Sequence, residues 1–308
     1  MVYFRYIDNP TAAVPFDTGL LESEGRGLVS ASDGLHGYSF YIRTPSNKPW
    51  YKALVTIAIC TYGRPESLND TLQSLSQQTF KNFEVVLITE KGNLSELRQK
   101  GLESSAGHIV SFIDDDVYCP PTWLQGVVES FRKGVLGVTG PTIITEEYLS
   151  NRDCFRFKKL RKFQEWLFKM PTEPGHLSTC GAPSMASNFG ECDYEGRVQY
   201  LECCNMSVSR KEALDVGGFD PVFYRTSEWC ELDLSLRLGR RGRLYFSPLA
   251  KLYHRPSRAG IYKARNKTKH RWDNFICFQK RWVKDGFRTT LYRGFIYTYF
   301  KLKDYGLF

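Results

Sequence analysis

Long hydrophobic runs are missing from this chain. None of its apolar stretches approaches the roughly 18 to 20 residues that a membrane-spanning helix needs. The first residues, MVYFRYIDNPTAAVPFD, also lack the long apolar centre of a secretory signal. We therefore expect a cytoplasmic protein that does not span a bilayer.

Regularly spaced cysteines are missing as well. The chain of 308 residues has nine cysteines, without a Cys-x-x-Cys pair and with irregular spacing, which argues against a disulfide framework. His176, Cys180 and Cys192 match no familiar zinc-binding spacing. We expect the cysteines to be reduced, with Cys203 and Cys204 buried.

Glycine-rich phosphate loops are the third absence. The segment CTYGRPES, which follows the first strand-like run, contains the single glycine Gly63, so neither GxGxxG nor GxxxxGK is present. This argues against a dinucleotide-binding enzyme and against a sugar nucleotidyltransferase with a glycine-rich, basic first loop. A phosphate-containing ligand would need positive charge from elsewhere, although the net charge of +9 favours acidic partners.

What the chain does contain is an alternation of strand and helix patterns from residue 54 onward. Continuous apolar runs typical of buried strands are followed by helical spacing, as in Leu68, Leu72 and Leu75 after Pro65. A second helix is expected from Asn93 as its N-cap, and a third with Leu124 and Val127 on its inner face. Right-handed crossovers wind such units into a mostly parallel sheet. The three strand-like runs are Leu54–Cys60, Phe83–Thr89 and His108–Asp114.

Three consecutive aspartates, Asp114 to Asp116, follow the third strand-like run. Ligands of open α/β sheets bind beyond the carboxyl ends of the strands, where these carboxylates are expected. Carboxylate oxygens suit Mg²⁺ or Mn²⁺, and such an ion can bridge to a diphosphate. The alternative is a helix-capping or solvated acidic turn.

Four segments in order carry a family resemblance. The chain from Ala53 to Arg258 resembles the family-2 glycosyltransferases, which are inverting enzymes with the GT-A fold. The resemblance implies an α/β GT-A fold, a Rossmann-like mostly parallel sheet with helices on both faces, plus a mainly helical C-terminal tail. It divides the chain into an N-terminal extension (1–50), a catalytic domain (51–258) and a basic, aromatic helical segment (259–308). The segments are VTIAICTYGRPESLNDTLQSLSQQTFKNFEVVLIT, SFIDDDVYCPPTWL, CCNMSVSRKEALDVGGFDPVF and EWCELDLSLRLGRRGRLYFSPLAKLYH.

The resemblance also implies a donor site. Asp116 occupies the metal-ligand position of the family, and His254 follows the last core strand, where a histidine often completes the metal shell. The alternative for His254 is a structural hydrogen bond, and the alternative for Arg98 is a place on a helix surface. Glu90 stands where the family usually has aspartate. The residues implied to bind the nucleotide sugar are Thr61, Tyr62, Arg64, Glu90, Arg98, Asp114, Asp115 and Arg258, with Arg255 as an alternative to Arg258 near phosphate.

The family commonly supplies its general base from a Glu-Asp pair just before a helix. Here the corresponding residues are Cys230 and Glu231, so Glu231 is the expected base. Glu228 and Asp233 remain alternatives, and Asp233 also suits the first turn of a helix. The leucines at 232, 234, 236 and 238 alternate as in a strand, and only the resemblance predicts a helix there.

Basic and aromatic residues interleave in two segments outside the donor site, at 151–170 and 270–308. Such segments suit an anionic membrane surface or a lipid-phosphate acceptor. The alternative is that the aromatics pack the tail onto the domain. Interleaving of this kind also suits single-stranded nucleic acid, but no recognised nucleic-acid motif accompanies it, and we expect no nucleic-acid partner.

Taken together, the sequence predicts a metal-dependent inverting glycosyltransferase. The expected donor is a nucleotide-diphosphate sugar with UDP as the nucleotide, and the expected cofactor is Mn²⁺ or Mg²⁺. The acceptor is a hydroxyl or phosphate, on a lipid-linked molecule or a growing glycan, and the site of action is the cytoplasm or the cytoplasmic face of the membrane. The alternative is a non-catalytic protein of the same fold that binds a nucleotide sugar or glycan.

Overall fold

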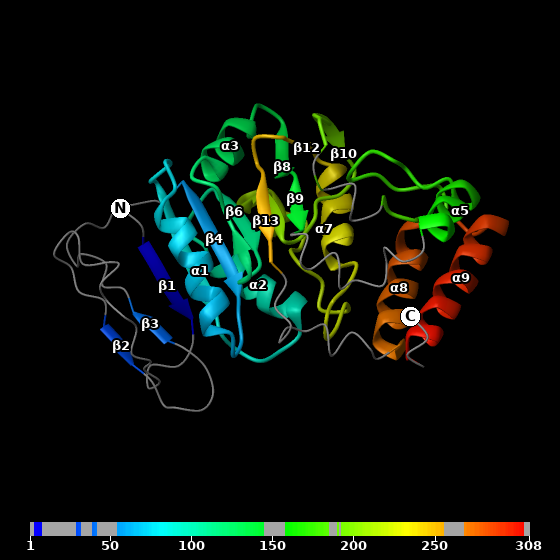
Figure 1. Cartoon of the computed structure of the whole chain (residues 1–308), viewed down its shortest axis with the longest axis horizontal. Helices are drawn as coiled ribbons and strands as arrows, with labels where there is room; N and C mark the ends of the chain where they lie inside the picture. The colour runs from blue at the N-terminus through cyan, green and yellow to red at the C-terminus, as the bar shows by residue number, and fades with distance from the viewer. Residues whose placement is uncertain are drawn as a thin grey trace.

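The protein is built on one twisted sheet with helices on both faces, and a helical group lies at one end (Figure 1). The computed structural model describes residues 3–7, 29–31, 39–41, 54–144, 158–184, 190, 192–255 and 268–304. The α/β architecture and the helical C-terminal part predicted from the sequence are confirmed.

The main sheet has eight strands in the order β1-β5-β4-β6-β11-β8-β12-β10. The pairs β1/β5, β5/β4, β4/β6 and β8/β12 are parallel, whereas β11 runs antiparallel between β6 and β8, and β10 is antiparallel to β12. The strands are β1 (Tyr3–Ile7), β4 (Val55–Cys60), β5 (Phe83–Ile88), β6 (Ile109–Ile113), β8 (Val135–Thr139), β10 (Gly196–Val198), β11 (Asn205–Ser209) and β12 (Arg243–Phe246).

Two smaller sheets accompany it. A three-stranded sheet has the order β7-β13-β9, in which β7 and β9 follow β6 and β8 along the chain, and β2 pairs with β3. These strands are β2 (Val29–Ala31), β3 (Ser39–Tyr41), β7 (Val117–Tyr118), β9 (Thr142–Ile144) and β13 (Leu252–His254). The helices are α1 (Pro65–Ser76), α2 (Leu94–Ser104), α3 (Trp123–Ser130), α5 (Lys158–Phe168), α6 (Arg210–Asp215), α7 (Cys230–Gly239), α8 (Thr268–Trp282) and α9 (Phe287–Asp304).

Alternate residues of β4 face two different cores, which explains its uninterrupted apolar sequence. Val55, Ile57 and Ile59 pack in a cluster with α1 and α3, while Ala58 packs in a second cluster with α2 and α7. The expected inner face of α1 is confirmed, because Leu68, Leu72 and Leu75 are all buried. The alternating leucines from residue 232 form helix α7, as the resemblance implied.

The C-terminal helices pack onto the rest of the chain. A third apolar cluster joins α5, α8 and α9 through Phe168, Phe275, Tyr292 and Phe300, and Phe278 of α8 is buried in the core that contains α7. The packing alternative for the aromatic tail is therefore confirmed for these residues. At the other end of the sheet, β1 pairs with β5 along its whole length, so part of the first 50 residues adds an edge strand.

Two expectations from composition can be compared with the structure. Among the described residues, no helix combines the length and the apolar character that crossing a bilayer requires. The eight cysteines in the described ranges are free, and Cys203 and Cys204 are buried as expected.

Candidate active site at the carboxyl edge of the sheet

The positive charge beside the three aspartates comes from Arg64. Its guanidinium lies 2.5 Å from Asp115 and 3.0 Å from Asp116, and Thr61 Oγ1 donates a 2.5 Å hydrogen bond to Asp115. Asp115 is completely buried, and burial raises its pKa to about 7 although Arg64 and Thr61 lower it. Arg64 is the N-cap residue of α1, so the loop between β4 and α1 contacts the aspartates that follow β6.

Strand pairing brings His254 to the same aspartates. In the pair β13/β7, His254 lies opposite Val117, the residue after the aspartate run. Its Nε2 atom is 3.1 Å from Asp116 and 3.7 Å from Asp114, and the Arg255 amide donates to the Asp116 carbonyl at 2.8 Å. Burial lowers the pKa of His254, but the hydrogen bond to Asp116 and the charge of Asp114 outweigh it and raise the pKa.

Three possible cation ligands lie close together, and one of them, Cys204, was not expected from the sequence. Asp114, Cys204 and His254 bring one ligand atom each to within 4.8 Å of one another. Near them, burial raises the pKa of Glu202 to about 7, although His254 and the Thr142 hydroxyl lower it. The chemistry of these donors fits a divalent cation, since carboxylate, imidazole and thiolate are all metal ligands.

The loop before α7 has an unusual backbone. Arg225, Ser227 and Trp229 have φ values of 60°, 51° and 79°, in the left-handed region that residues other than glycine seldom adopt. Strain of this kind costs on the order of 1 to 3 kcal/mol per residue and persists only where surrounding contacts hold it.

The N-terminus of α2 supplies those contacts. Leu94 N donates to the Arg225 carbonyl at 2.9 Å, and Ser95 N donates to Ser227 Oγ at 2.9 Å. The Asn93 side chain, expected to cap its own helix, instead accepts a 2.8 Å hydrogen bond from Arg225 N. The loop and the helix therefore satisfy each other's polar groups, because free amides at a helix start need acceptors.

This loop leads directly to Glu231 in the first turn of α7. Glu231 is partly exposed at the site, and Cys230 Sγ lies 3.6 Å from its Oε2 atom. Burial raises the pKa of Glu231, and the nearby Arg98 lowers it. Arg98 is itself buried, with Nη1 3.6 Å from Cys230 Sγ, so the surface alternative for this arginine is wrong.

The chain is similar in sequence to known glycosyltransferases. Residues 88–182 match the family model "Glycosyl transferase family 2", which covers less than half of the chain. The resemblance to family-2 glycosyltransferases is confirmed. A glucosyl-dolichyl phosphate glucuronosyltransferase from Haloferax volcanii is 25% identical over 194 residues, 54% of this chain and 56% of that glycosyltransferase. The chain thus spans about half the length of this relative.

Solved structures of glycosyltransferases are similar to this chain at lower sequence identity. A mannosyltransferase from Pyrobaculum calidifontis, in complex with GDP-Man and Mn²⁺, is 15% identical, with 83% of this chain and 73% of that chain covered and a TM-score of 0.49. GalNAc-T7 with UDP, GalNAc and Mn²⁺ is 11% identical, with 68% and 45% covered and a TM-score of 0.48.

The glycosyltransferase resemblance also implied four further residues near the donor. Tyr62 is 43% exposed beside Thr61, and Glu90 forms an ion pair with Lys100 of α2. Arg255 stacks over the Tyr118 ring at 5.3 Å. Arg258 lies outside the described residues.

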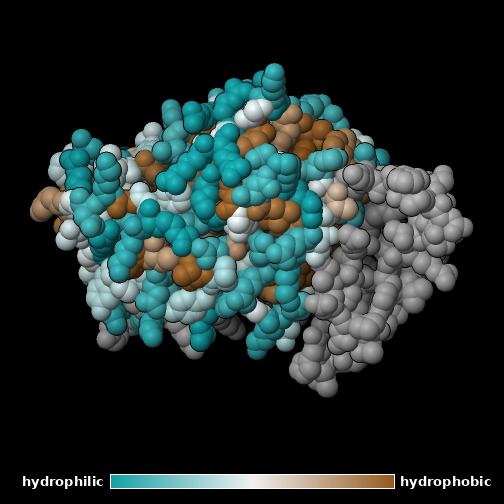
Figure 2. Space-filling view, turned by 180° about the vertical axis from the view of Figure 1, so that it is seen from behind, coloured by the Kyte–Doolittle hydropathy of each residue, from teal (hydrophilic) through white to brown (hydrophobic). Residues whose placement is uncertain are grey.

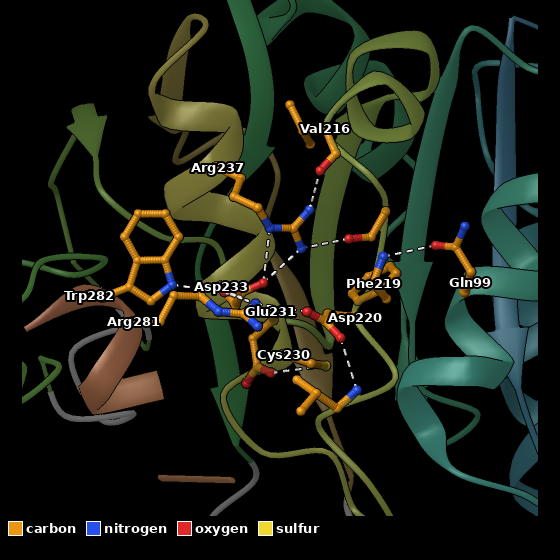
Figure 3. A network of polar contacts seen from close by, with 12 residues as sticks. Gln99, Val216, Phe219, Asp220, Cys230, Glu231, Asp233, Arg237, Arg281 and Trp282 are labelled. Carbon is orange, nitrogen blue, oxygen red and sulfur yellow. Dashed lines mark hydrogen bonds and ion pairs between the residues drawn. The ribbon is translucent and has the colours of Figure 1, made fainter. Parts of the chain in front are cut away.

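The two alternative bases of the glycosyltransferase hypothesis are both engaged by other side chains. Glu228 accepts a hydrogen bond from Thr226 and forms a 3.2 Å ion pair with Arg271 of α8. Asp233 is fully buried, and three donors surround it: Arg237 at 2.8 Å, Arg281 at 2.9 Å and Trp282 at 2.8 Å (Figure 3). Asp233 therefore joins α7 to α8.

Removing the charge of Asp233 should destabilise the fold. We expect Asp233→Asn to lower the free energy of unfolding by about 3 kcal/mol, because two arginines lose their shared buried anion. Urea denaturation would measure this. Asp285→Asn is the matched control, since Asp285 pairs with Arg293 but its side chain is 85% exposed, and little change is expected there. Equal effects of the two substitutions would contradict the assigned role of Asp233.

Proposed function

We propose that the protein is an inverting glycosyltransferase that uses a nucleotide-diphosphate sugar, with UDP as the nucleotide, and a divalent cation, Mn²⁺ or Mg²⁺. The observation that carries this proposal is a carboxylate, Glu231, in the first turn of α7 close to the buried Arg98. Arg98 interacts electrostatically with both Glu231 and Asp114, which links the two groups in one site. An inverting transfer needs this combination of a base and an anion-stabilising centre.

The chain's own residues account for the proton in this reaction. Glu231 accepts the proton of the acceptor hydroxyl as that oxygen bonds to the anomeric carbon, and the bond from this carbon to the diphosphate breaks on the opposite face. Its raised pKa makes Glu231 a stronger base than an exposed glutamate. Thr61, Arg64 and Asp115 form a fixed network where the donor is proposed to bind. Arg64 supplies positive charge at the first turn.

A bound divalent cation would neutralise charge on the departing diphosphate. Asp116 and His254, the ligands proposed from the resemblance, lie 3.1 Å apart, with Asp114 beside them.

Two measurements test the proposal. A thermal-shift panel of nucleotide sugars, each with and without Mn²⁺, should identify one donor whose stabilising effect depends on the metal. Release of the nucleoside diphosphate should then require both the metal and an acceptor. Metal-dependent stabilisation without release in the presence of a broad acceptor set would favour the alternative, a non-catalytic nucleotide-sugar-binding protein.

The pH dependence of transfer tests Glu231 specifically. Because protonated Glu231 cannot accept a proton, kcat should fall as the pH drops through its raised pKa, above the usual 4.5 of glutamate. Arg98→Met should move this acidic limb to higher pH, since Arg98 lowers the pKa of Glu231. Arg98→Lys keeps the charge and should leave the limb nearer to its original position. An unchanged limb in Arg98→Met would contradict the electrostatic link.

We further propose a lipid-phosphate acceptor at an anionic membrane surface. The relative from Haloferax volcanii has glucosyl-dolichyl phosphate in its name. On this chain, the end formed by α5, α8 and α9 interleaves hydrophobic and hydrophilic residues at the surface (Figure 2). Exposed aromatics there include Phe163 and Trp166 of α5, whose rings are 6.0 Å apart, and Phe287 of α9. Several basic side chains of the same helical group and of the turn between α8 and α9 are also exposed, among them Lys280, Lys284, Arg288 and Lys301.

Vesicle cosedimentation tests this surface. The protein should bind anionic vesicles at low salt, with each basic group worth ~1 kcal/mol, and binding should weaken as salt screens the charges. The double substitution Phe163→Ser/Trp166→Ser should weaken binding because it removes apolar area from the headgroup boundary. Leu249→Ser is the control, since Leu249 is 55% exposed but lies outside these helices. Absence of vesicle binding at every salt concentration would refute a membrane role.

A further inference from the structure

The pairing of two strands places Cys204 at the candidate cation site. Cys204 directly precedes β11, and in the antiparallel pair β11/β6 the first residue of β11, Asn205, lies opposite Ile113, the residue before Asp114. His254 reaches the same place from β13, opposite Val117. Three chain segments that are distant in sequence thus bring an oxygen, a sulfur and a nitrogen donor to within 4.8 Å of one another.

The donor set differs in chemistry from the aspartate site expected from the sequence. Mg²⁺ is bound almost entirely by oxygen ligands, whereas a thiolate and an imidazole select zinc and similar cations. Zn²⁺ is typically bound by four ligands in a tetrahedron, and catalytic sites supply three from the protein. The three groups here, Asp114, Cys204 and His254, match that number.

Glu202 adds a further carboxylate at this place. Its carboxylate lies beside the Thr142 hydroxyl, and burial raises its pKa to about 7 although Thr142 and His254 lower it. The carboxylate interacts electrostatically with His254 and Asp114, so it lies near the same group. A cation bound beside these carboxylates would offset the cost of burying their negative charge.

We propose that Cys204, together with Asp114 and His254, binds Zn²⁺ and that this thiophilic cation competes with Mn²⁺ or Mg²⁺ for His254. The competition rests on the proposed function, which assigns His254 to the cation of the transfer reaction. On binding, the thiol of Cys204 releases its proton to solvent and the sulfur forms the bond to the metal. Zn²⁺ therefore binds through Cys204, a ligand that Mn²⁺ and Mg²⁺ do not require.

Cobalt substitution tests the sulfur ligand without any measurement of activity. Titration of the full-length protein with Co²⁺, in the absence of nucleotide, should produce a thiolate-to-cobalt charge-transfer band in the near ultraviolet, and Zn²⁺ should abolish it. Cys204→Ser should lose this band. Cys203→Ser is the matched control, because Cys203 is the adjacent buried cysteine and is not one of the three ligands, and it should keep the band.

Asp114→Asn provides a second variant in case Cys204→Ser does not fold. The Asp114 side chain is 37% exposed, so the substitution should leave the fold intact. Its Co²⁺ affinity should fall by more than about tenfold, while the charge-transfer band returns at saturating Co²⁺. An affinity equal to that of the unsubstituted protein would overturn the proposed ligand set.

The outcomes separate this inference from the proposed function. A normal Mn²⁺-dependent transfer reaction with no charge-transfer band, or with a band that persists in folded Cys204→Ser, would overturn the zinc site alone. A cobalt band that depends on Cys204 in a protein that never releases nucleotide would uphold the zinc site and overturn the proposed transfer activity.

Discussion

Replacement of Glu231 by glutamine is expected to lower the rate of sugar transfer by about 10²- to 10⁴-fold, the usual contribution of a positioned general base. The amide has nearly the shape of the carboxylate but does not accept the acceptor proton at neutral pH. Because Glu231 lies at the start of α7 rather than among the aspartates, the affinity for the nucleotide sugar should change little. Single-turnover kinetics, with donor binding measured separately, would check both parts of this expectation.

Three other substitutions complete the experiment. Glu212→Gln, on α6 outside the site, should transfer sugar at the unsubstituted rate. Glu228→Gln and Asp233→Asn should act mainly on stability, since both carboxylates are held by residues of α8. If the large loss of rate followed Glu228→Gln in a folded protein while Glu231→Gln remained active, Glu228 would be the base.

Replacement of Asp116 by asparagine should abolish transfer and the metal-dependent part of donor binding, with the fold retained. The two carboxylate oxygens of Asp116 face Arg64 and His254, and an amide presents one neutral oxygen in place of two that share a charge. Hard cations prefer the ionised group. Thermal shifts with and without Mn²⁺, together with nucleotide release, would measure the effect.

Asp215→Asn is a suitable control for this second experiment. Asp215 also pairs with a basic residue, Lys211, but both lie on the surface helix α6. Its substitution should leave the Mn²⁺ response unchanged. Near-normal turnover by Asp116→Asn would place the cation elsewhere, and Asp114 would then be the next residue to test.

The strands and helices that position the site could be predicted from the sequence because their signals are local. The run VTIAIC supplies two buried faces at once, and the spacing of Leu68, Leu72 and Leu75 is that of one helix face. Topology then places the ends of parallel strands at a common edge, so the neighbourhood of the aspartates followed from pattern alone.

Contacts that depend on register could not be predicted in this way. Cys204 reaches Asp114 only because β11 runs antiparallel to β6 with Asn205 opposite Ile113. A shift of one residue would turn its neighbours to the other face of the sheet, and sequence alone does not give the register. The resemblance gave the helix at residue 230, but nothing local indicated that Asp233 would be enclosed by donors from α8.

The left-handed loop at residues 225–229 limits how its sequence can vary over evolutionary time. Glycine would relieve the backbone at Arg225, whose side chain is exposed. The same change at Ser227 or Trp229 would remove a group in use, because Ser227 Oγ accepts from the α2 amide and the Trp229 ring packs 5.0 Å from that of Phe278. Substitutions at positions 227 and 229 should therefore be rare, because their side chains hold the loop that leads to Glu231. Most sequence variation in this loop should occur at position 225.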